Sequence, residues 1–143
     1  MIFLLDTNTC IAIIRGTDLT LLGQVRELSI EVTVFLLSIV EFEVLFGVAN
    51  SHPERRTLNS RKLGIFFSHP FLRYAFTTED AYASAAIRAD LKAAGTPIGA
   101  YDLLIAGQCI QNQCTVVTAN VKEFSRVSGL KWVNWASLRL PQE

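Results

Sequence analysis

Short apolar runs alternate with longer segments of helical periodicity along almost the whole of this 143-residue chain. Runs rich in β-branched or bulky apolar residues predict strands at 2–5, 31–37, 72–76, 115–118 and 131–135. The segments between them predict helices at 8–15, 18–28, 39–49, 54–67, 78–94 and 100–113. This alternation is typical of a mostly parallel sheet covered by helices, so we expect an α/β fold.

The composition favours one compact soluble domain spanning residues 1–143. Half of the residues are apolar and the formal net charge is zero, so any binding of a polyanion must use a local basic patch. The apolar run 2–5 is too short for a signal peptide. The apolar region 32–49 contains two glutamates, which argues against a membrane helix. We therefore expect a cytoplasmic protein with no membrane partner.

Asp6 follows the first apolar run directly, and polar Thr7 and Asn8 come next. A buried strand that ends here places the Asp6 carboxylate at the carboxyl edge of the sheet, where open α/β sheets bind their ligands. Strand order can bring further acids to this edge from the helix 39–49, from Asp102 and from the turn at 120–123. The sequence thus predicts a cluster of carboxylates.

Glu41 and Glu43 both lie in the apolar helix 39–49. A helix turns about 100° per residue, so the two side chains point about 200° apart and only one can face the cluster. Periodicity does not choose between them, because nearly every neighbouring position is apolar. A helix start with solvent-facing glutamates explains both residues without any chemistry.

The two later acids also have structural explanations. Asp102 lies in the first turn of a helix after a Gly-Thr-Pro-Ile-Gly segment, where an acid complements the helix dipole. Asn120 followed by Glu123 is close to a capping box, which satisfies backbone donors and implies no chemistry. Alternatively, the rigid turn aims Asp102 at the site, and Asn120 or Glu123 contributes an oxygen to a hydrated ion.

Clustered carboxylates raise one another's pKa unless a cation holds them together, so the pattern favours a hard divalent ion such as Mg²⁺ or Mn²⁺. Neither His52 nor His69 falls in a motif suited to an acid/base pair. The three cysteines form no CxxC pair, which gives a thiolate zinc site little support and fits a reducing compartment.

Together these motifs resemble the PIN domain family, and most closely the small VapC-like toxins of bacterial toxin–antitoxin pairs. The matching segments are Leu-Leu-Asp-Thr-Asn at 4–8, Glu43 followed by Gly47, Gly-Ala-Tyr-Asp-Leu-Leu-Ile-Ala at 99–106, and Thr-Ala-Asn-Val-Lys-Glu-Phe at 118–124. The resemblance spans nearly the whole chain, and the four segments in this order are a specific signal.

The resemblance implies a three-layer α/β/α sandwich with a mostly parallel central sheet. It also implies an endoribonuclease that depends on Mg²⁺, for which Mn²⁺ can substitute. Carried over by position, Asp6, Glu43 and Asp102 become catalytic acids that bind the metal, which selects Glu43 over Glu41. Many relatives have an aspartate where this chain has Asn120, so Glu123 becomes the fourth catalytic acid.

Other residues are expected to support this chemistry. Thr7, Asn8 and Thr118 would hydrogen-bond the carboxylates and fix their rotamers, with Asn120 as a further supporting residue. Arg15 and Lys122 lie nearest the motifs among the basic side chains and are the first candidates for RNA contact. The expected reaction cleaves single strands or loops of a structured RNA such as tRNA, leaves a 3′-hydroxyl and inhibits translation.

The resemblance also implies a cognate antitoxin that covers the active site, and a homodimer. The segment 58–67 is rich in bulky apolar residues, which predicts either core or a surface for one of these partners. Two alternatives to the nuclease stay open. One is a catalytically weak or silent PIN-fold module that binds RNA or protein. The other is a phosphoryl-transfer domain, although Asp6 lacks the Asp-x-Asp arrangement that such chemistry uses.

Overall fold

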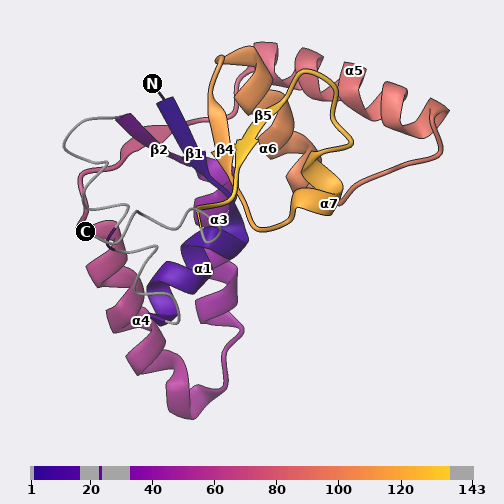
Figure 1. Ribbon diagram of the computed structural model, residues 1–143. Helices are drawn as coiled ribbons and strands as arrows, with labels where there is room; N and C mark the ends of the chain where they lie inside the picture. The colour runs from indigo at the N-terminus through magenta and orange to yellow at the C-terminus, as the bar shows by residue number, and fades with distance from the viewer. Residues whose placement is uncertain (1, 17–22, 24–32, 136–143) are drawn as a thin grey trace, which may run out of the picture.

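The computed structural model describes residues 2–16, 23 and 33–135, and its fold is α/β (Figure 1). Within these residues, five strands form one sheet in the order β3-β2-β1-β4-β5, and every neighbouring pair is parallel. The strands are β1 (Ile2–Leu5), β2 (Thr33–Leu37), β3 (Leu72–Tyr74), β4 (Thr115–Val117) and β5 (Lys131–Val133). The predicted parallel sheet is confirmed.

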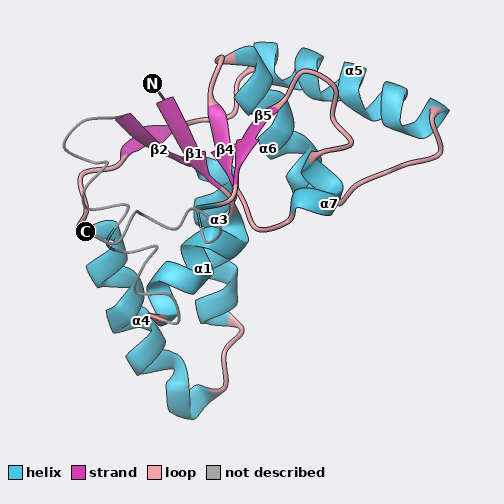
Figure 2. Cartoon of the chain, in the orientation of Figure 1, coloured by secondary structure: helices cyan, strands magenta, loops and turns pink. Residues whose placement is uncertain are grey.

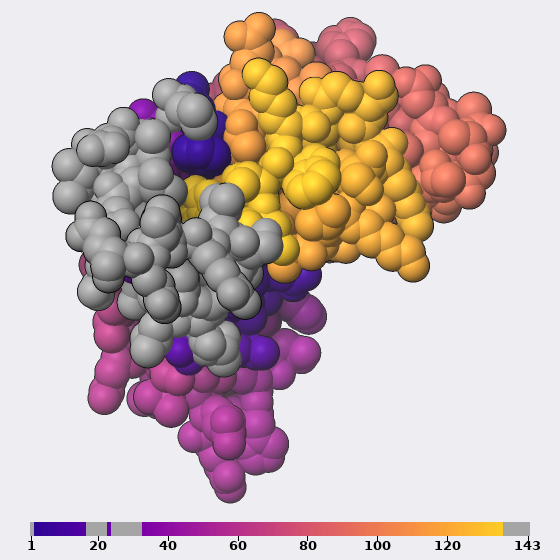
Figure 3. Space-filling model, in the orientation of Figure 1, coloured from indigo at the N-terminus to yellow at the C-terminus, as the bar shows by residue number. Residues whose placement is uncertain are grey.

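The helices form two groups around the sheet (Figure 2). One group contains α1 (Thr7–Arg15), α3 (Ser38–Ala49) and α4 (Pro53–Phe67). The other contains α5 (Thr78–Ala93), α6 (Ala100–Gln111) and the short α7 (Val121–Phe124). The end of the molecule formed by α3 and α4 projects from the body in the space-filling view (Figure 3). Among the described residues, no helix has both the length and the apolar character needed to cross a bilayer.

The predicted boundaries differ from the observed ones in a few places. The helix expected at 18–28 falls, apart from Gly23, outside the described residues, as do positions 31 and 32 of the second strand. Strand β1 has its predicted bounds, whereas β3, β4 and β5 end one or two residues earlier than predicted. Helix α6 stops at Gln111 rather than at 113, because Gln113 adopts a φ of 54° as the chain turns into β4.

The order in which the chain adds strands to the sheet reverses between β1 and β4. The chain passes from β1 to β2 on one side, whereas β4 pairs with β1 on the other side. Such a switch point opens a crevice at the carboxyl ends of the two strands. In the register of this pair, Leu5 lies opposite Val117, so the next residues, Asp6 and Thr118, meet at the mouth of the crevice.

The core lies between the sheet and its helices. Leu4, Leu36, Val116 and Val117 are buried on the central strands, and this agrees with their continuous apolar sequences, because helices cover both faces of a parallel sheet. In the segment 58–67, Leu63 and Phe66 are buried while Leu58 and Ile65 are exposed. The core interpretation is therefore confirmed for Leu63 and Phe66, and the partner surface stays a prediction.

Helix α5 begins with a capping box. The Thr77 hydroxyl accepts from the Asp80 N–H, and the Asp80 carboxylate accepts from the Thr77 N–H. The cap residue is thus Thr77, and α5 begins at Thr78, as predicted. Asp80 is fully buried, and its other oxygen accepts from the Asn112 side chain at 3.1 Å. This bond ties the start of α5 to the end of α6.

Helices α5 and α6 pack closely at Gly107. A Cβ atom placed there would lie 1.9 Å from Ser84 Oγ and 3.0 Å from Ser84 Cα. Because Cα is a backbone atom, the contact can be relieved only by a shift of the helix. Helix α6 carries Asp102 in its first turn, so this contact helps to set the position of the candidate site.

We predict that Gly107→Ala destabilises the protein by about 1–3 kcal/mol, because overpacking forces the two helices apart. Urea unfolding at constant temperature measures the change. Gly64→Ala in α4 is the matched control: a Cβ there meets nothing within 4 Å, and alanine favours helix by up to about 1 kcal/mol. Equal stabilities of the two variants would contradict the close-packing argument.

Candidate active site

Asp6 ends β1, begins α1 and is only 2% exposed. One carboxylate oxygen accepts from the Thr9 N–H at 2.9 Å, which caps the helix, and the other accepts from the Thr118 hydroxyl at 2.6 Å. The predicted hydrogen bond from Thr118 is therefore present. Thr9 was not predicted, although a backbone donor three residues after an aspartate is the usual partner of an N-cap.

Glu43 and Glu41 face different partners. The Thr7 hydroxyl donates to Glu43 Oε1 at 2.6 Å, which places this glutamate beside the first turn of α1. Glu41 instead accepts from Arg73 Nε at 2.8 Å in an ion pair with β3. The structure thus brings Glu43 toward Asp6 and gives Glu41 a cation elsewhere, a choice that periodicity could not make.

Asn120 links the two remaining acids. Its side-chain nitrogen donates to Asp102 Oδ2 at 3.1 Å and to Glu123 Oε2 at 2.8 Å. The capping-box interpretation of Asn120 and Glu123 is wrong, because the Asn120 side chain makes no cap bond to α7. Only its backbone takes part in the turn, with the Asn120 N–H donating to the Thr118 hydroxyl at 2.8 Å.

The carboxylates influence one another's protonation. The pKa of Asp102 is raised to about 7. Burial is the largest cause, and the hydrogen bond with Glu123 and the nearby charges of Asp6 and Glu123 add to it. The effect of Asp6 on Asp102 shows that the two aspartates face the same region. Hydrogen bonds from Asn120 and with Asp102 lower the pKa of Glu123, with smaller help from Arg126 and the Gly99 backbone.

A hollow in the surface lies beside this group. It is lined by Asn8, Ala119, Asn120, Lys122, Glu123 and Arg126. Lys122 is therefore close to the acids, as expected. Arg126 anchors its guanidinium on the Pro97 carbonyl at 2.9 Å and adds a second cation. Asn8 is exposed on the rim of the hollow.

The prediction for Arg15 is wrong about its position. Arg15 lies in the last turn of α1, at the opposite end of that helix from Asp6. There it lines a separate groove between α1, α3 and α4, together with Ile11, Ile14, Val44, Gly47, Val48, Asn59 and Lys62. Sequence distance from Asp6 misled the prediction, because a nine-residue helix separates its ends by about 13 Å.

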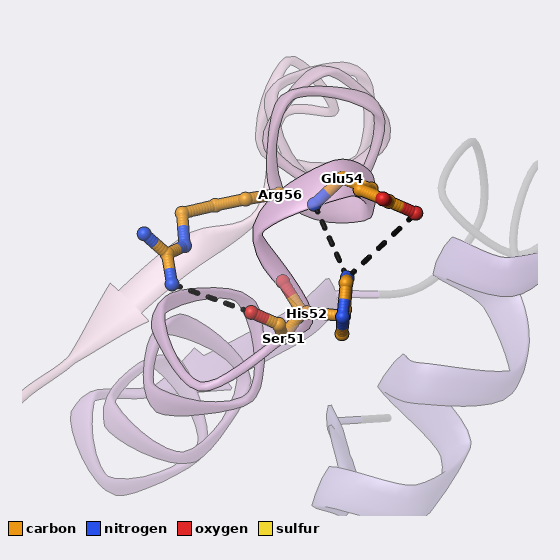
Figure 4. A network of polar contacts seen from close by, with 4 residues as sticks. All are labelled: Ser51, His52, Glu54 and Arg56. Atoms are coloured by element: carbon orange, nitrogen blue, oxygen red, sulfur yellow. Dashed lines mark hydrogen bonds and ion pairs between the residues drawn. The ribbon is translucent and has the colours of Figure 1, made fainter.

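The histidines and cysteines have other roles. His52 lies in the turn between α3 and α4, where its Nδ1 accepts from the Glu54 N–H and lies 4.0 Å from the Glu54 carboxylate (Figure 4). Arg56 donates to the Ser51 carbonyl in the same turn (Figure 4). The cysteines are free and buried, and burial raises the pKa of Cys109 to about 12. Such thiols are poor nucleophiles.

The donor set fits a hard divalent cation. All four acids offer carboxylate oxygen, which Mg²⁺ and Mn²⁺ prefer. Burial, and after it the neighbouring acids, raise the pKa of Asp102. In the described part of the chain, however, no group of three or more such side chains is arranged to hold an ion as it stands. Bonds to Thr7, Thr118 and Asn120 occupy the carboxylates instead.

Comparison with known proteins assigns the family. A family model described as PIN domain matches residues 3–130. The chain belongs to the PIN domain family. It is 34% identical to "Ribonuclease VapC2" of Rickettsia felis, over 94% of this chain and 98% of that protein. It is 33% identical to "tRNA(fMet)-specific endonuclease VapC" of Salmonella typhimurium, over 93% and 97%.

Solved structures of PIN domain relatives have the same fold. The crystal structure of VapBC2 from Rickettsia felis, bound to a DNA fragment from its promoter, contains a chain that superposes with a TM-score of 0.87. That chain is 33% identical, and the match covers 94% of this protein and 99% of that chain. DNA-bound VapBC of Salmonella typhimurium gives 0.85 at 30% identity, covering 94% and 98%. The predicted PIN-like fold is confirmed.

The pKa of Asp102 predicts a pH dependence of stability in chelator-treated protein. The folded protein keeps the Asp102 proton up to about pH 7, whereas the unfolded chain releases it near pH 4. Folding is therefore favoured by this group at low pH, and that contribution is lost as the pH rises from about 4 to about 7. Asp102→Asn should remove this part of the pH dependence.

Thermal unfolding of both proteins across this range measures the difference. Asp90→Asn is the matched control, because Asp90 is exposed on α5. Its curve should run parallel to that of the wild type. A difference between wild type and Asp102→Asn that stays constant from pH 4 to pH 7 would contradict the assignment.

Proposed function

We propose that this protein is a metal-dependent endoribonuclease that acts as the toxin of a toxin–antitoxin pair. The observation that carries the proposal is the chain of hydrogen bonds that links Asp6 through Thr118 and Asn120 to Asp102 and Glu123. Glu43 accepts from Thr7, the residue after Asp6. Full-length similarity to proteins named as VapC ribonucleases supports it. The name of the Salmonella relative favours a structured RNA such as tRNA as substrate, and cleavage of tRNA would inhibit translation.

Asp6, Glu43 and Asp102 would hold the ion. A bound Mg²⁺ or Mn²⁺ supplies a water of lowered pKa and stabilises charge on the scissile phosphate. The Asp6 carboxylate is held by Thr118 and Thr9, and Glu43 is held by Thr7, so their oxygens are oriented before substrate arrives. Glu123 would orient a water or support a second ion. The expected products carry a 3′-hydroxyl.

Lys122 and Arg126 would contact the RNA backbone. Carboxylates alone repel a polyanion, so substrate binding needs cations on the rim of the site. Both side chains line the hollow that contains Asn120 and Glu123. Arg15, in the last turn of α1, stays a proposed contact for RNA that extends beyond the hollow.

We propose that an antitoxin binds the groove between α1, α3 and α4. Its walls include Ile11, Ile14, Val44 and Val48, and two cations, Arg15 and Lys62, flank them. These features suit an amphipathic segment with acidic side chains. Two of the similar solved structures are described as VapBC complexes, which supports a partner of this kind. The buried free thiols support a reducing, cytoplasmic location.

A second candidate function is a PIN-fold module that binds RNA without cutting it. The specific observation in its favour is Asn120, a neutral residue bonded to two of the acids. Calorimetric titration with Mn²⁺ separates the candidates, because a silent module should give no heat of ion binding.

We predict that Asp6→Asn and Asp102→Asn each reduce Mg²⁺-dependent RNA cleavage by roughly 100-fold or more. This is the usual loss of rate when one group that stabilises charge in a transition state is removed. Mapping of new RNA ends by sequencing measures the cleavage. The variants should still bind RNA, because Lys122 and Arg126 are unchanged.

Asp90→Asn again serves as the matched control and should cleave like the wild type. Full Mg²⁺-dependent activity in Asp6→Asn and Asp102→Asn protein, purified free of other nucleases, would refute the proposal.

We also propose that the protein forms a homodimer through the outer face of α3. Phe42, Leu45 and Phe46 are 52%, 50% and 58% exposed, and their spacing places them on one side of the helix. Tyr101 of α6 extends this surface, since its ring lies 5.7 Å from that of Phe42. A contiguous apolar patch of this kind marks an association surface.

We predict that Leu45→Glu with Phe46→Glu converts a dimer into a monomer. Burial of such side chains contributes about 1.5–3 kcal/mol each, and the charges oppose association further. Sedimentation velocity at micromolar concentration measures the state. Ile65→Glu is the control, since Ile65 is an exposed apolar residue on α4. A wild-type protein that sediments as a monomer would remove the dimer from the proposal.

A further inference from the structure

We propose that Asn120 is a positioning residue whose amide occupies the place of a second divalent cation, so that the site binds one ion rather than two. The inference rests on the proposed metal-dependent function and deepens it. The feature that carries it is the amide of Asn120 between the carboxylates of Asp102 and Glu123.

The direction of the amide is fixed by its neighbours. Both atoms that it contacts, Asp102 Oδ2 at 3.1 Å and Glu123 Oε2 at 2.8 Å, belong to acceptors. Only the –NH₂ end of an asparagine can donate, and it has one hydrogen for each of these oxygens. The Asn120 amide therefore presents its nitrogen to both carboxylates, and nitrogen protonated in this way cannot bind a cation.

The backbone at Asn120 is held in place from two directions. Its N–H donates to the Thr118 hydroxyl at 2.8 Å, and that hydroxyl donates in turn to Asp6 at 2.6 Å. Its carbonyl accepts from the N–H of Phe124, which is fully buried. A chain of hydrogen bonds thus runs from Asp6 through Thr118 to Asn120 and the other two acids. The amide is part of the framework of the site.

An ion between Asp102 and Glu123 would compete with this amide. Two neighbouring carboxylates repel unless a cation or a donor lies between them, and Asn120 already supplies a neutral donor. To bind a cation there, the amide would have to turn its oxygen inward and lose both hydrogen bonds. At Asp6 and Glu43 the donors are the single protons of the Thr118 and Thr7 hydroxyls, and each carboxylate keeps further lone pairs for a cation.

An aspartate at position 120 should reverse the situation. The substitution replaces a donor of nearly the same shape by a third carboxylate, and three carboxylates favour a further divalent ion. The backbone bonds to Thr118 and Phe124 do not involve the side chain and should persist.

The test is calorimetric titration of the full chain with Mn²⁺, together with electron paramagnetic resonance, which detects spin coupling between neighbouring Mn²⁺ ions. We expect one ion per chain in the wild type, and two coupled ions in Asn120→Asp. Asn120→Ala should bind one ion with roughly 10–100-fold weaker affinity, because the ligand Asp102 loses its outer partner and no third carboxylate is added to hold a further ion. Asn50→Asp adds the same charge in the exposed turn after α3 and should bind one ion like the wild type.

Each contrary result has a distinct meaning. Two ions in the wild type, a single ion in Asn120→Asp, or unchanged affinity in Asn120→Ala would overturn the role of Asn120 and leave the nuclease proposal standing. Absence of Mn²⁺ binding in the wild type would overturn both. The wild-type stoichiometry requires no variant to fold, so the inference stays testable even if a substitution destabilises the chain.

Discussion

The parallel pairing of β1 with β4 is the constraint on which the rest of the site depends. Because Leu5 lies opposite Val117, the following residues, Asp6 and Thr118, meet at the carboxyl edge of the sheet. A buried carboxylate is tolerated only with hydrogen-bond donors, and Asp6 has one from Thr118 and one from the first turn of α1. Asp6 thus follows the last residue of β1, caps the start of α1 and supplies one carboxylate of the candidate site.

The carboxylates of the site are held in place by neutral hydrogen-bond donors. Thr7 donates to Glu43, Thr118 to Asp6, and Asn120 to both Asp102 and Glu123. The cations Lys122 and Arg126 stay on the rim of the hollow. Neutral donors orient carboxylates without cancelling their charge. Burial and the nearby charges of Asp6 and Glu123 raise the pKa of Asp102. In the proposed function, the acids attract a divalent cation and the cations on the rim attract RNA.

Most of the fold followed from local patterns. Apolar runs located the strands and helical periodicity located the helices, because burial on both faces of a parallel sheet leaves a continuous apolar signature. The errors in the predicted boundaries lie at the ends of helices and strands. There the backbone conformation of one residue can end an element, as the positive φ of Gln113 does after α6. The acids Asp6, Glu43, Asp102 and Glu123 were also named from the sequence, although the resemblance to a family, and not periodicity, selected Glu43 over Glu41.

The sequence by itself determined the α/β class, the strand that ends in Asp6 and the set of carboxylates, because these depend on residue type and short-range spacing. Tertiary structure decided which donor each carboxylate receives, turned the Asn120 amide away from its helix toward two acids, and placed Arg15 far from the site while Arg126 came close. Those outcomes depend on which segments pack side by side, and a side chain bonds to the partner that packing brings within reach rather than to its neighbour in the chain.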